Sequence, residues 1–257
     1  MEYTKEEMMI ITASKMLQNG EVCFVGIGLP STACNLARLT HAPEIVLIYE
    51  SGTIDTKPHI LPLSIGDDIL AETASTVVSV PEIFNYWLQG GKVDVGFLGG
   101  AQIDKFGNIN STVIGPYRNP KVRLPGAGGA PEIASNAKRT FVIMKQSKRS
   151  FVDKVDFITS AGFLGGGNER KDLGITGEGP TCIITDLGIL EPDPETKEFL
   201  LTHIHPGISL EEVKNNTGWE LRISENLKTT HEPSKNYLEV LRDLQERTSN
   251  SHSQSTL

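Results

Sequence analysis

Residues 44–52 read Glu-Ile-Val-Leu-Ile-Tyr-Glu-Ser-Gly, a short apolar run that ends on a carboxylate. The unbroken Val, Leu and Ile follow Pro43 and precede Ser51-Gly52, which predicts a strand buried on both faces, as in a parallel sheet. Glu50 comes directly after this strand, and ligands of open α/β sheets bind beyond the carboxyl ends of the strands. Position alone does not distinguish a site carboxylate from a solvated loop residue or a helix cap.

The chain has 257 residues, 38% of them hydrophobic, which is enough for a substantial core. We predict one domain over residues 1–248 and a disordered tail over residues 249–257, which are rich in Ser, Asn and Gln. The first residues are charged and lack the apolar segment of a signal peptide, and no apolar run reaches membrane-spanning length. These features predict a soluble, cytoplasmic protein with no membrane contact.

The three cysteines are Cys23, Cys34 and Cys182. Their spacing does not match a metal site, and an odd number argues against a disulfide framework. We therefore expect buried thiols, no bound metal and no permanently bound cofactor.

The net charge of −8 is unevenly distributed. Residues 105–154 contain ten Lys and Arg against Glu132 and Asp153, a net charge of +8, which leaves −16 on the rest of the chain. A basic stretch inside an acidic protein suits a small phosphorylated molecule better than a nucleic-acid duplex. Any single one of these cations is equally compatible with a solvated surface position.

The segment before residue 44 predicts the first part of a βαβ unit. Val22–Val25 is expected to form a buried strand and residues 31–39 a helix, with Glu44–Tyr49 as the next strand. The intervening Gly26 and Gly28 resemble the start of a dinucleotide-binding fingerprint. Ser31 stands where that fingerprint has its third glycine, so we discount a nicotinamide site and keep the glycine pair as a possible site loop before a helix.

A second glycine-rich stretch covers Arg123–Glu132, which reads Arg-Leu-Pro-Gly-Ala-Gly-Gly-Ala-Pro-Glu. It lies between a predicted strand at residues 122–124 and a helix that begins near Ala130. A tight turn needs one or two glycines, whereas three with two alanines leave backbone N–H groups open to a ligand at a helix N-terminus. Gly126, Gly128, Gly129 and Ala130 are therefore candidates for binding an oxyanion or a phosphorylated substrate.

Other polar residues are candidates with stronger structural alternatives. The Phe-Gly-Asn sequence at residues 106–108 predicts a hairpin, in which Gln102 and Asn108 either line a site or serve the turn. Lys145, Lys148 and Arg149 form a basic turn that could contact phosphates. His203 and His205 lack a third ligand at a recognisable spacing, which favours structural or solvent-facing roles.

The remaining pattern predicts further elements. Phe84, Trp87 and Leu88 are spaced as the core stripe of a helix that starts at Pro81. Residues 53–75 are expected to form a long connection over the Glu50 end of the sheet, and residues 163–180 a mobile glycine-rich loop. We also expect helices over residues 5–19, 209–218 and 234–248, and strands at residues 76–80, 93–98, 141–144, 150–152, 157–159, 182–186 and 199–204, the last two as an antiparallel pair.

A carboxylate at one strand end and an amide-presenting loop at another suit acyl transfer through a carboxylate nucleophile. Glu is ionised at neutral pH, since its reference pKa is about 4.3, so it can attack without a separate base. Attack on a thioester gives an anhydride, and the departing thiolate can then form a thioester on the Glu. Each backbone N–H donor to the oxyanion contributes about 3 kcal/mol in comparable sites.

These segments together resemble the β subunits of family I coenzyme A-transferases, in the glutaconate CoA-transferase branch. The resemblance covers most of the chain, to about Gly218, and its joint motifs are specific. It rests on residues 23–30, 49–52, 61–67, 86–108 and 123–132.

The resemblance implies a NagB/RpiA-type α/β fold, an open and largely parallel sheet flanked by helices with a small antiparallel addition. It implies ping-pong transfer of CoA from succinyl-CoA to a 3-oxo dicarboxylic acid, with Glu50 as the nucleophile and Gly128 and Gly129 in the oxyanion loop. It also implies an α subunit as partner, in an α2β2 assembly that shares the acid-binding residues. The sequence Tyr49-Glu50-Ser51-Gly52 differs from the Ser-Glu-Asn-Gly of the shorter branch. We therefore do not infer the substrates of this chain from those of the shorter branch.

Three alternatives remain open. A CoA-transferase for glutaconate or another acid would use the same nucleophile, and an acyl-CoA hydrolase would use the same scaffold with water as acceptor. A metabolite-sensing module without turnover is the non-enzymatic alternative, because a fold does not fix a function. The absence of a recognisable DNA-binding segment argues against a transcriptional sensor.

Overall fold

The structure is a computed structural model that describes residues 2–254. The chain divides into two compact units. Unit 1 contains the chain up to Phe97 together with the segment from Glu232, and unit 2 contains Leu98–His231.

Unit 1 is built on a sheet with the strand order β5-β1-β2-β3-β4. Strands β5, β1 and β2 are parallel, whereas β3 and β4 continue the sheet in antiparallel fashion. The strands are β1 (Val22–Phe24), β2 (Val46–Ile48), β3 (Thr53–Ile54), β4 (Thr76–Val77) and β5 (Val95–Leu98). The helices are α1 (Lys5–Lys15), α2 (Leu29–Leu39), α3 (Asp68–Glu72), α4 (Val80–Glu82), the π-helical segment Ile83–Leu88 and α8 (Lys235–Gln254).

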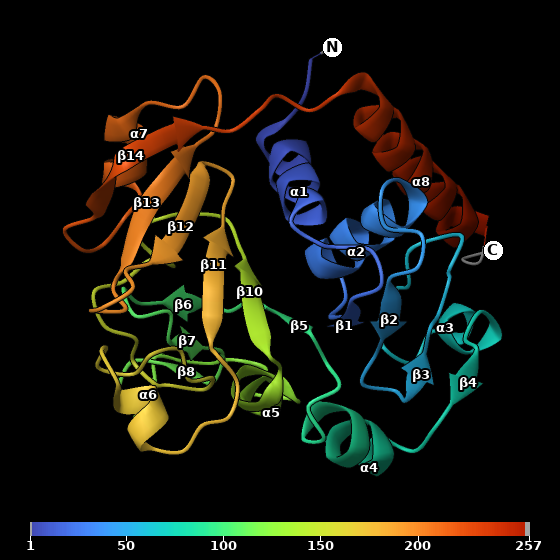
Figure 1. Cartoon of the computed structure of the whole chain (residues 1–257), viewed down its shortest axis with the longest axis horizontal. Helices are drawn as coiled ribbons and strands as arrows, with labels where there is room; N and C mark the ends of the chain where they lie inside the picture. The colour runs from blue at the N-terminus through green and yellow to red at the C-terminus, as the bar shows by residue number, and fades with distance from the viewer. Residues whose placement is uncertain (1, 255–257) are drawn as a thin grey trace. The chain divides into compact units, whose positions relative to one another are not determined.

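Helices α1, α2 and α8 pack on one another (Figure 1). Three leucines of α8, Leu238, Leu241 and Leu244, are completely buried, as the amphipathic pattern predicts. The predicted capping box of α1 is present, with Thr4 and Glu7 bonding each other's backbone N–H groups. Because segments from both ends of the chain build this helical layer, unit 1 depends on contacts that are distant in sequence.

In unit 2 five large-sheet strands follow the order β14-β13-β12-β11-β10. Its outer pairs β10–β11 and β13–β14 are parallel, and the pairs around β12 are antiparallel. The large-sheet strands are β10 (Arg139–Ile143), β11 (Pro180–Ile184), β12 (Gly188–Pro192), β13 (Phe199–Ile204) and β14 (Arg222–Thr229). Two small antiparallel sheets pair β6 (Gln102–Ile103) with β7 (Ile109–Asn110) and β8 (Val113–Ile114) with β9 (Val122–Arg123). The helices are α5 (Ala130–Asn136), α6 (Glu169–Asp172) and α7 (Leu210–Asn215).

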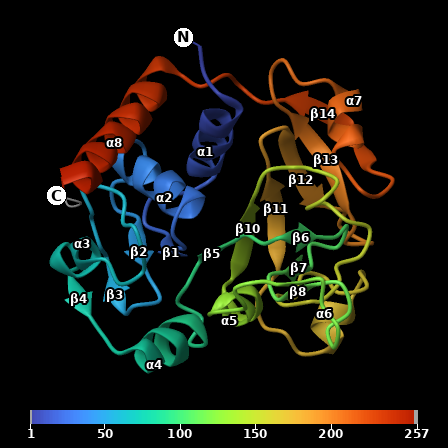
Figure 2. The same cartoon turned by 180° about the vertical axis from the view of Figure 1, so that it is seen from behind.

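The predicted α/β fold class is confirmed. The antiparallel part is larger than expected, since β12 lies between β11 and β13 and the predicted direct pairing of those two strands is wrong. Strands β3, β8, β12 and β14 have no counterpart among the predicted elements. Figures 1 and 2 show α5 and α6 near the same end of β10 and β11.

Several predicted boundaries are wrong for local reasons. Helix α1 ends at Lys15 instead of residue 19, because Met16 and Leu17 bond three residues back and tighten the chain. In the segment after Pro81 the buried residues are Ile83 and Leu88, five apart, which fits the observed π-helical turn. Of the predicted stripe, Leu88 is buried, and Phe84 and Trp87 are half-buried. The predicted strand at residues 150–152 forms only isolated bridges, at Phe151 and Val152, and residues 157–159 are not in a strand or bridge.

Two segments predicted to lack regular structure contain it. The connection over residues 53–75 includes β3 and α3, and the glycine-rich stretch at residues 163–180 includes α6 and the first residue of β11. The predicted tail overlaps α8, which runs to Gln254 with Ser253 bonded to the Ser249 carbonyl, while residues 255–257 lie outside the described residues.

Candidate functional site

Glu50 occupies the turn of a tight hairpin between β2 and β3 in unit 1. The Gly52 N–H donates to the Tyr49 carbonyl at 3.0 Å, and the Tyr49 N–H donates to the Thr53 carbonyl at 3.2 Å. Glu50 and Ser51 are therefore the two central residues of a four-residue turn. Glu50 is half-buried, so the turn leaves its side chain partly accessible at the carboxyl end of β2.

Gly52 fixes the position of this turn against the next strand. Its φ of +97° lies in the region that favours glycine, and its carbonyl accepts from the Val78 N–H at 2.9 Å. A Cβ at this position would lie 2.0 Å from the Val78 carbonyl oxygen. Any side chain at residue 52 would therefore push the Glu50 turn away from the Val78 segment.

Tyr49 anchors the turn from the other side. Its side chain is fully buried, and its hydroxyl shares a 2.8 Å hydrogen bond with Ser31 Oγ in α2. Burial raises the pKa of the Tyr49 phenol, which keeps it neutral. Ser31 is the residue that stands in place of the third fingerprint glycine, so its hydroxyl has a structural use that a glycine could not provide.

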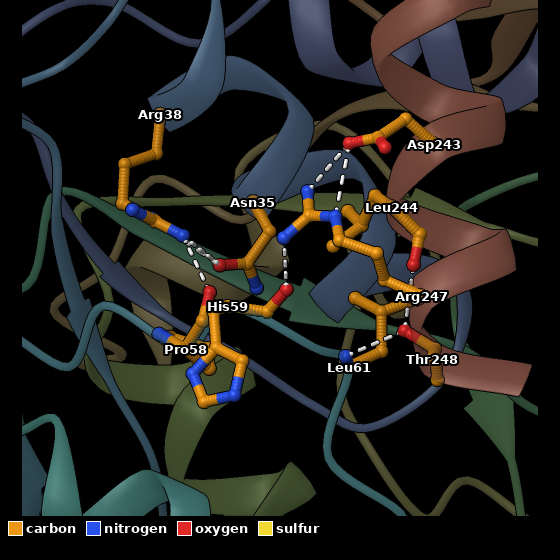
Figure 3. Close-up of polar contacts among 9 residues, drawn as sticks. All are labelled: Asn35, Arg38, Pro58, His59, Leu61, Asp243, Leu244, Arg247 and Thr248. Carbon is orange, nitrogen blue, oxygen red and sulfur yellow. Dashed lines mark hydrogen bonds and ion pairs between the residues drawn. The ribbon is translucent and has the colours of Figure 1, made fainter. Parts of the chain in front are cut away.

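Two arginines fasten the chain that follows the hairpin to α2 and α8 (Figure 3). Arg38 donates to the Asn35 side chain and, at 2.7 Å, to the Pro58 carbonyl. Arg247 donates to the His59 carbonyl, and Thr248 Oγ1 accepts from the Leu61 N–H at 2.9 Å. These bonds span as many as 188 residues of sequence, so sequence analysis did not identify Arg38 or Arg247.

Gly26 and Gly28 follow β1 at the same end of the sheet where Glu50 follows β2. Strands β1 and β2 run parallel with Phe24 opposite Ile48, and the Val25 N–H donates to the Ile48 carbonyl at 2.9 Å. Gly28 has a φ of +83° and is the N-cap of α2. The structure therefore places the glycine pair and Glu50 beyond the carboxyl ends of neighbouring parallel strands, where α/β sheets bind ligands.

The second glycine-rich stretch lies in unit 2, between β9 and α5. The Gly126 N–H donates to the Ser111 carbonyl at 3.1 Å, and the Ala130 N–H donates to the Ala127 carbonyl at 3.0 Å. Gly126 and Gly128 have φ values of +112° and +51°, and Gly129 is the N-cap of α5. The backbone conformation of this loop therefore depends on its glycines, as predicted.

Two amides of this loop face no protein acceptor. Within residues 2–254, the N–H groups of Ala127 and Gly128 donate no hydrogen bond, and both residues are exposed. The amides of Gly126 and Ala130 are occupied inside the fold. Of the predicted donors, Gly128 is thus available, and Ala127 is an additional donor that sequence analysis did not single out.

Gln102 and Asn108 have structural partners in unit 2. The Asn108 amide bonds both Asp104 oxygens and the Leu164 carbonyl, and its oxygen accepts from two backbone N–H groups. Burial raises the pKa of the Asp104 carboxyl despite these bonds. The Gln102 oxygen accepts from the Asn110 side chain, and the Asn110 oxygen accepts from the Val113 N–H at the start of β8. These amides hold the hairpin and the strand pair that leads to the glycine loop.

The basic turn after β10 is held by its one buried member, Gln146. The Gln146 side chain bonds Thr185 and Thr217, and its N–H donates to the Asp186 carboxylate. Lys145, Lys148 and Arg149 flank it and are exposed. Their contact with phosphates stays a prediction.

Of the two candidate histidines, His205 is structural, and His203 is half-buried with its Nδ1 bonded to the Thr202 hydroxyl. His205 is 2% exposed, with Nε2 donating to the Thr185 carbonyl and Nδ1 bonded to Thr230. Burial lowers the pKa of His205, so the ring is neutral. Over the described part of the chain, no group of three or more His, Cys, Asp or Glu is arranged to hold a metal ion.

Unit 1 thus provides a half-buried carboxylate on a hairpin turn, and unit 2 provides two open backbone amides before a helix. The carboxylate can attack an activated acyl carbon, and the amides can hold a developing oxyanion. All three cysteines are buried thiols outside any disulfide, so none is exposed as a competing nucleophile. None of the helices described in the structure is long and apolar enough to span a membrane.

Comparison with known proteins defines the class: a model of the Coenzyme A transferase family matches residues 6–216, and the chain belongs to this family. The chain is 61% identical over 252 residues to one of the subunits of 3-oxoadipate CoA-transferase from Pseudomonas knackmussii, covering 98% of this chain and 97% of that protein. It is 40% identical over 227 residues to one of the subunits of glutaconate CoA-transferase from Acidaminococcus fermentans, covering 86% and 85%.

A solved structure supports the fold. The crystal structure of glutaconate coenzyme A-transferase from Acidaminococcus fermentans superposes with a TM-score of 0.88 at 36% sequence identity, over 93% of this chain and 94% of that one. The fold and family that the sequence motifs implied are confirmed.

Proposed function

We propose that the chain is the subunit of a cytoplasmic CoA-transferase that moves CoA from succinyl-CoA to 3-oxoadipate through a thioester on Glu50. The near-complete match to a 3-oxoadipate CoA-transferase subunit, at 61% identity, supports this substrate. That relative is itself named as one subunit of its enzyme, which supports a partner subunit here, and we expect the two to form an α2β2 assembly.

The reaction begins with attack of a Glu50 carboxylate oxygen on the thioester carbon of succinyl-CoA. The new C–O bond replaces the C–S bond, giving a mixed anhydride and the CoA thiolate. The thiolate then attacks the Glu50 carbonyl carbon, which releases succinate and leaves CoA on Glu50. The 3-oxoadipate carboxylate repeats the two steps in reverse order and regenerates free Glu50, so no proton is transferred in the cycle.

The described residues support each role. The hairpin presents the Glu50 side chain in a half-buried position, and the open Ala127 and Gly128 amides suit the oxyanion of each tetrahedral intermediate. The basic turn with Lys148 and Arg149 suits the CoA phosphates. That Glu50 and the glycine loop act on one substrate is part of the proposal.

The direct test is mass spectrometry of the chain co-expressed with its partner subunit. Incubation with succinyl-CoA should add a CoA-sized mass to the peptide that contains Glu50, and 3-oxoadipate should remove it. Glu50→Ala should give no adduct, whereas Glu72→Ala, at an exposed position of α3, should label normally. Absence of an adduct during turnover would contradict the proposed mechanism.

The acceptor is tested by comparing kcat/KM for 3-oxoadipate, glutaconate and acetoacetate on the co-expressed pair. A preference for 3-oxoadipate is expected. Release of CoA to water at the same rate without any acceptor would identify a hydrolase instead.

A further inference from the structure

Unit 2 contains a cavity of about 510 Å³ that includes none of the residues assigned to the proposed transfer. It is lined by α6, by the loop that follows it, and by residues from β11, β12 and the turn after β12. Its volume lies within the range of about 300–1,000 Å³ typical of small-molecule sites. Three cations, Arg170, Lys171 and Lys197, line it together with one carboxylate, Glu178.

Arg170 is the most unusual of these residues because its guanidinium is buried without a counter-ion. The side chain is 4% exposed and donates to the carbonyls of Ala134, Ala161, Gly162 and Gly177. A guanidinium has five N–H donors, so one remains. No carboxylate of the described residues pairs with it. Burial lowers the Arg170 pKa to about 10, and the group stays charged at neutral pH.

The two lysines of the cavity also lack ion pairs. Neither Lys171 nor Lys197 pairs with a carboxylate among residues 2–254, and Lys197 Nζ lies 5.6 Å from the centre of the Phe163 ring. Lys171 is exposed and Lys197 is half-buried, so both ammonium groups are accessible to a ligand in the cavity. With Glu178 counted, the wall carries a net charge of +2, which an anionic ligand would neutralise.

The composition of the wall narrows the ligand class. A small dicarboxylate has no hydrogen-bond donor for Glu178, whereas a carboxylate beside a phosphate site commonly accepts a hydrogen bond from a ribose hydroxyl. The cavity is also large for a six-carbon acid. We propose that this cavity binds a nucleotide, with Arg170, Lys171 and Lys197 facing its phosphates and Glu178 accepting from a ribose hydroxyl or the base amine.

The cavity is connected to the glycine loop through α5. Arg170 bonds the Ala134 carbonyl, and the Gly177 N–H donates to the Ser135 carbonyl at 2.8 Å, so the cavity wall holds the C-terminal end of the helix. The glycine loop precedes the N-terminal end. Because α5 has seven residues, the two ends are about 10 Å apart. The ligand is thus either the nucleotide end of CoA, which rests on the proposed function, or a free nucleotide that acts on the loop through α5. In the first case this cavity, in place of the basic turn with Lys148 and Arg149, holds the CoA phosphates.

The test uses 3′,5′-ADP, the nucleotide portion of CoA, titrated calorimetrically into the full-length chain co-expressed with its partner. The double variant Lys171→Glu/Lys197→Glu should raise the Kd at least about a hundredfold, since each charge-assisted contact is worth roughly tenfold or more. Lys214→Glu, an exposed position of α7 in the same unit, should leave the Kd unchanged. No binding at millimolar 3′,5′-ADP, or equal Kd values for wild type and double variant, would overturn the proposal.

Competition separates the two sources of the nucleotide. If 3′,5′-ADP binds and raises the KM for succinyl-CoA, the cavity holds the end of the substrate. If it binds without competing, the cavity takes a free nucleotide. The proposed function and the nucleotide cavity can fail independently. If no CoA adduct forms on Glu50, the proposed function fails, but 3′,5′-ADP should still bind at this cavity.

Discussion

Gly52→Ala should displace Glu50 while leaving its carboxylate in the protein. The added Cβ would lie 2.0 Å from the Val78 carbonyl oxygen, and real Cβ contacts below 3.0 Å essentially do not occur. The two backbone segments must therefore separate by at least about 1 Å. Because the Gly52 N–H closes the turn onto Tyr49, this shift is transmitted to Glu50 directly.

The expected loss follows from that displacement. Misplacing a reacting group by about 1 Å costs on the order of 100-fold in rate. A positive φ at a residue with a Cβ costs roughly 1–2 kcal/mol, and weakening the bond from the Val78 N–H to the Gly52 carbonyl about 1 kcal/mol more. We therefore expect kcat/KM to fall about 100-fold and the free energy of unfolding to fall by about 2–3 kcal/mol.

Gly20→Ala is the matched control for this experiment. Gly20 has a φ of +82°, but no atom lies within 4 Å of the position of its Cβ. This variant incurs the backbone strain without the collision and should keep its activity. Steady-state transfer with the partner subunit and denaturant unfolding measure both effects. A Gly52→Ala enzyme with the wild-type kcat/KM would refute the claim that the hairpin positions the nucleophile.

Three further predictions concern stability. Arg170→Lys keeps the charge but loses the planar set of donors to four carbonyls, and should lower the free energy of unfolding by about 3 kcal/mol in urea. The hydrogen bond from Arg242 lowers the pKa of Glu7. The ionised Glu7 carboxylate therefore stabilises the fold at neutral pH, and this stabilisation is lost as the pH falls below about 4.5. Glu7→Gln should accordingly lose less stability than wild type on acidification, as measured by thermal unfolding. Thr53 Oγ1 is buried without a partner, so Thr53→Val should be neutral or stabilising by about 1 kcal/mol, whereas Thr56→Val breaks a 2.8 Å hydrogen bond and should destabilise.

Local patterns predicted the elements that carry the site. The apolar run before Glu50 and the glycines before Ala130 each lie within ten residues. The first pattern correctly predicted strand β2, and the second correctly predicted the start of helix α5. The hairpin after Glu50 was missed because β3 has only two residues and no alternation to detect. Its position is set by pairing with β4, more than twenty residues further on.

The roles of polar side chains were harder to predict than the backbone. Asn108 is a polar residue in a turn, as many site residues are. Its side-chain oxygen nevertheless accepts from the N–H groups of Gly162 and Leu164, more than fifty residues away. Arg170 lies in a stretch whose glycines suggest mobility, and its partners come from three separate segments. Such non-local bonds leave no pattern in a single sequence, because the residue type is the same whether its partner is protein, water or substrate.

Both parts of the proposed catalytic machinery are defined by backbone geometry more than by neighbouring side chains. Glu50 is placed by hydrogen bonds among Tyr49, Gly52 and Val78, and the open amides of Ala127 and Gly128 by those of Gly126 and Ala130. The catalytic groups can then stay fixed while surrounding side chains vary, which is a physical reason for related chains to share the scaffold and differ in the acid they use. Substrate choice should accordingly respond to changes in side chains around the hairpin, whereas a change at Gly52 should lower the rate of transfer to every acid by a similar factor.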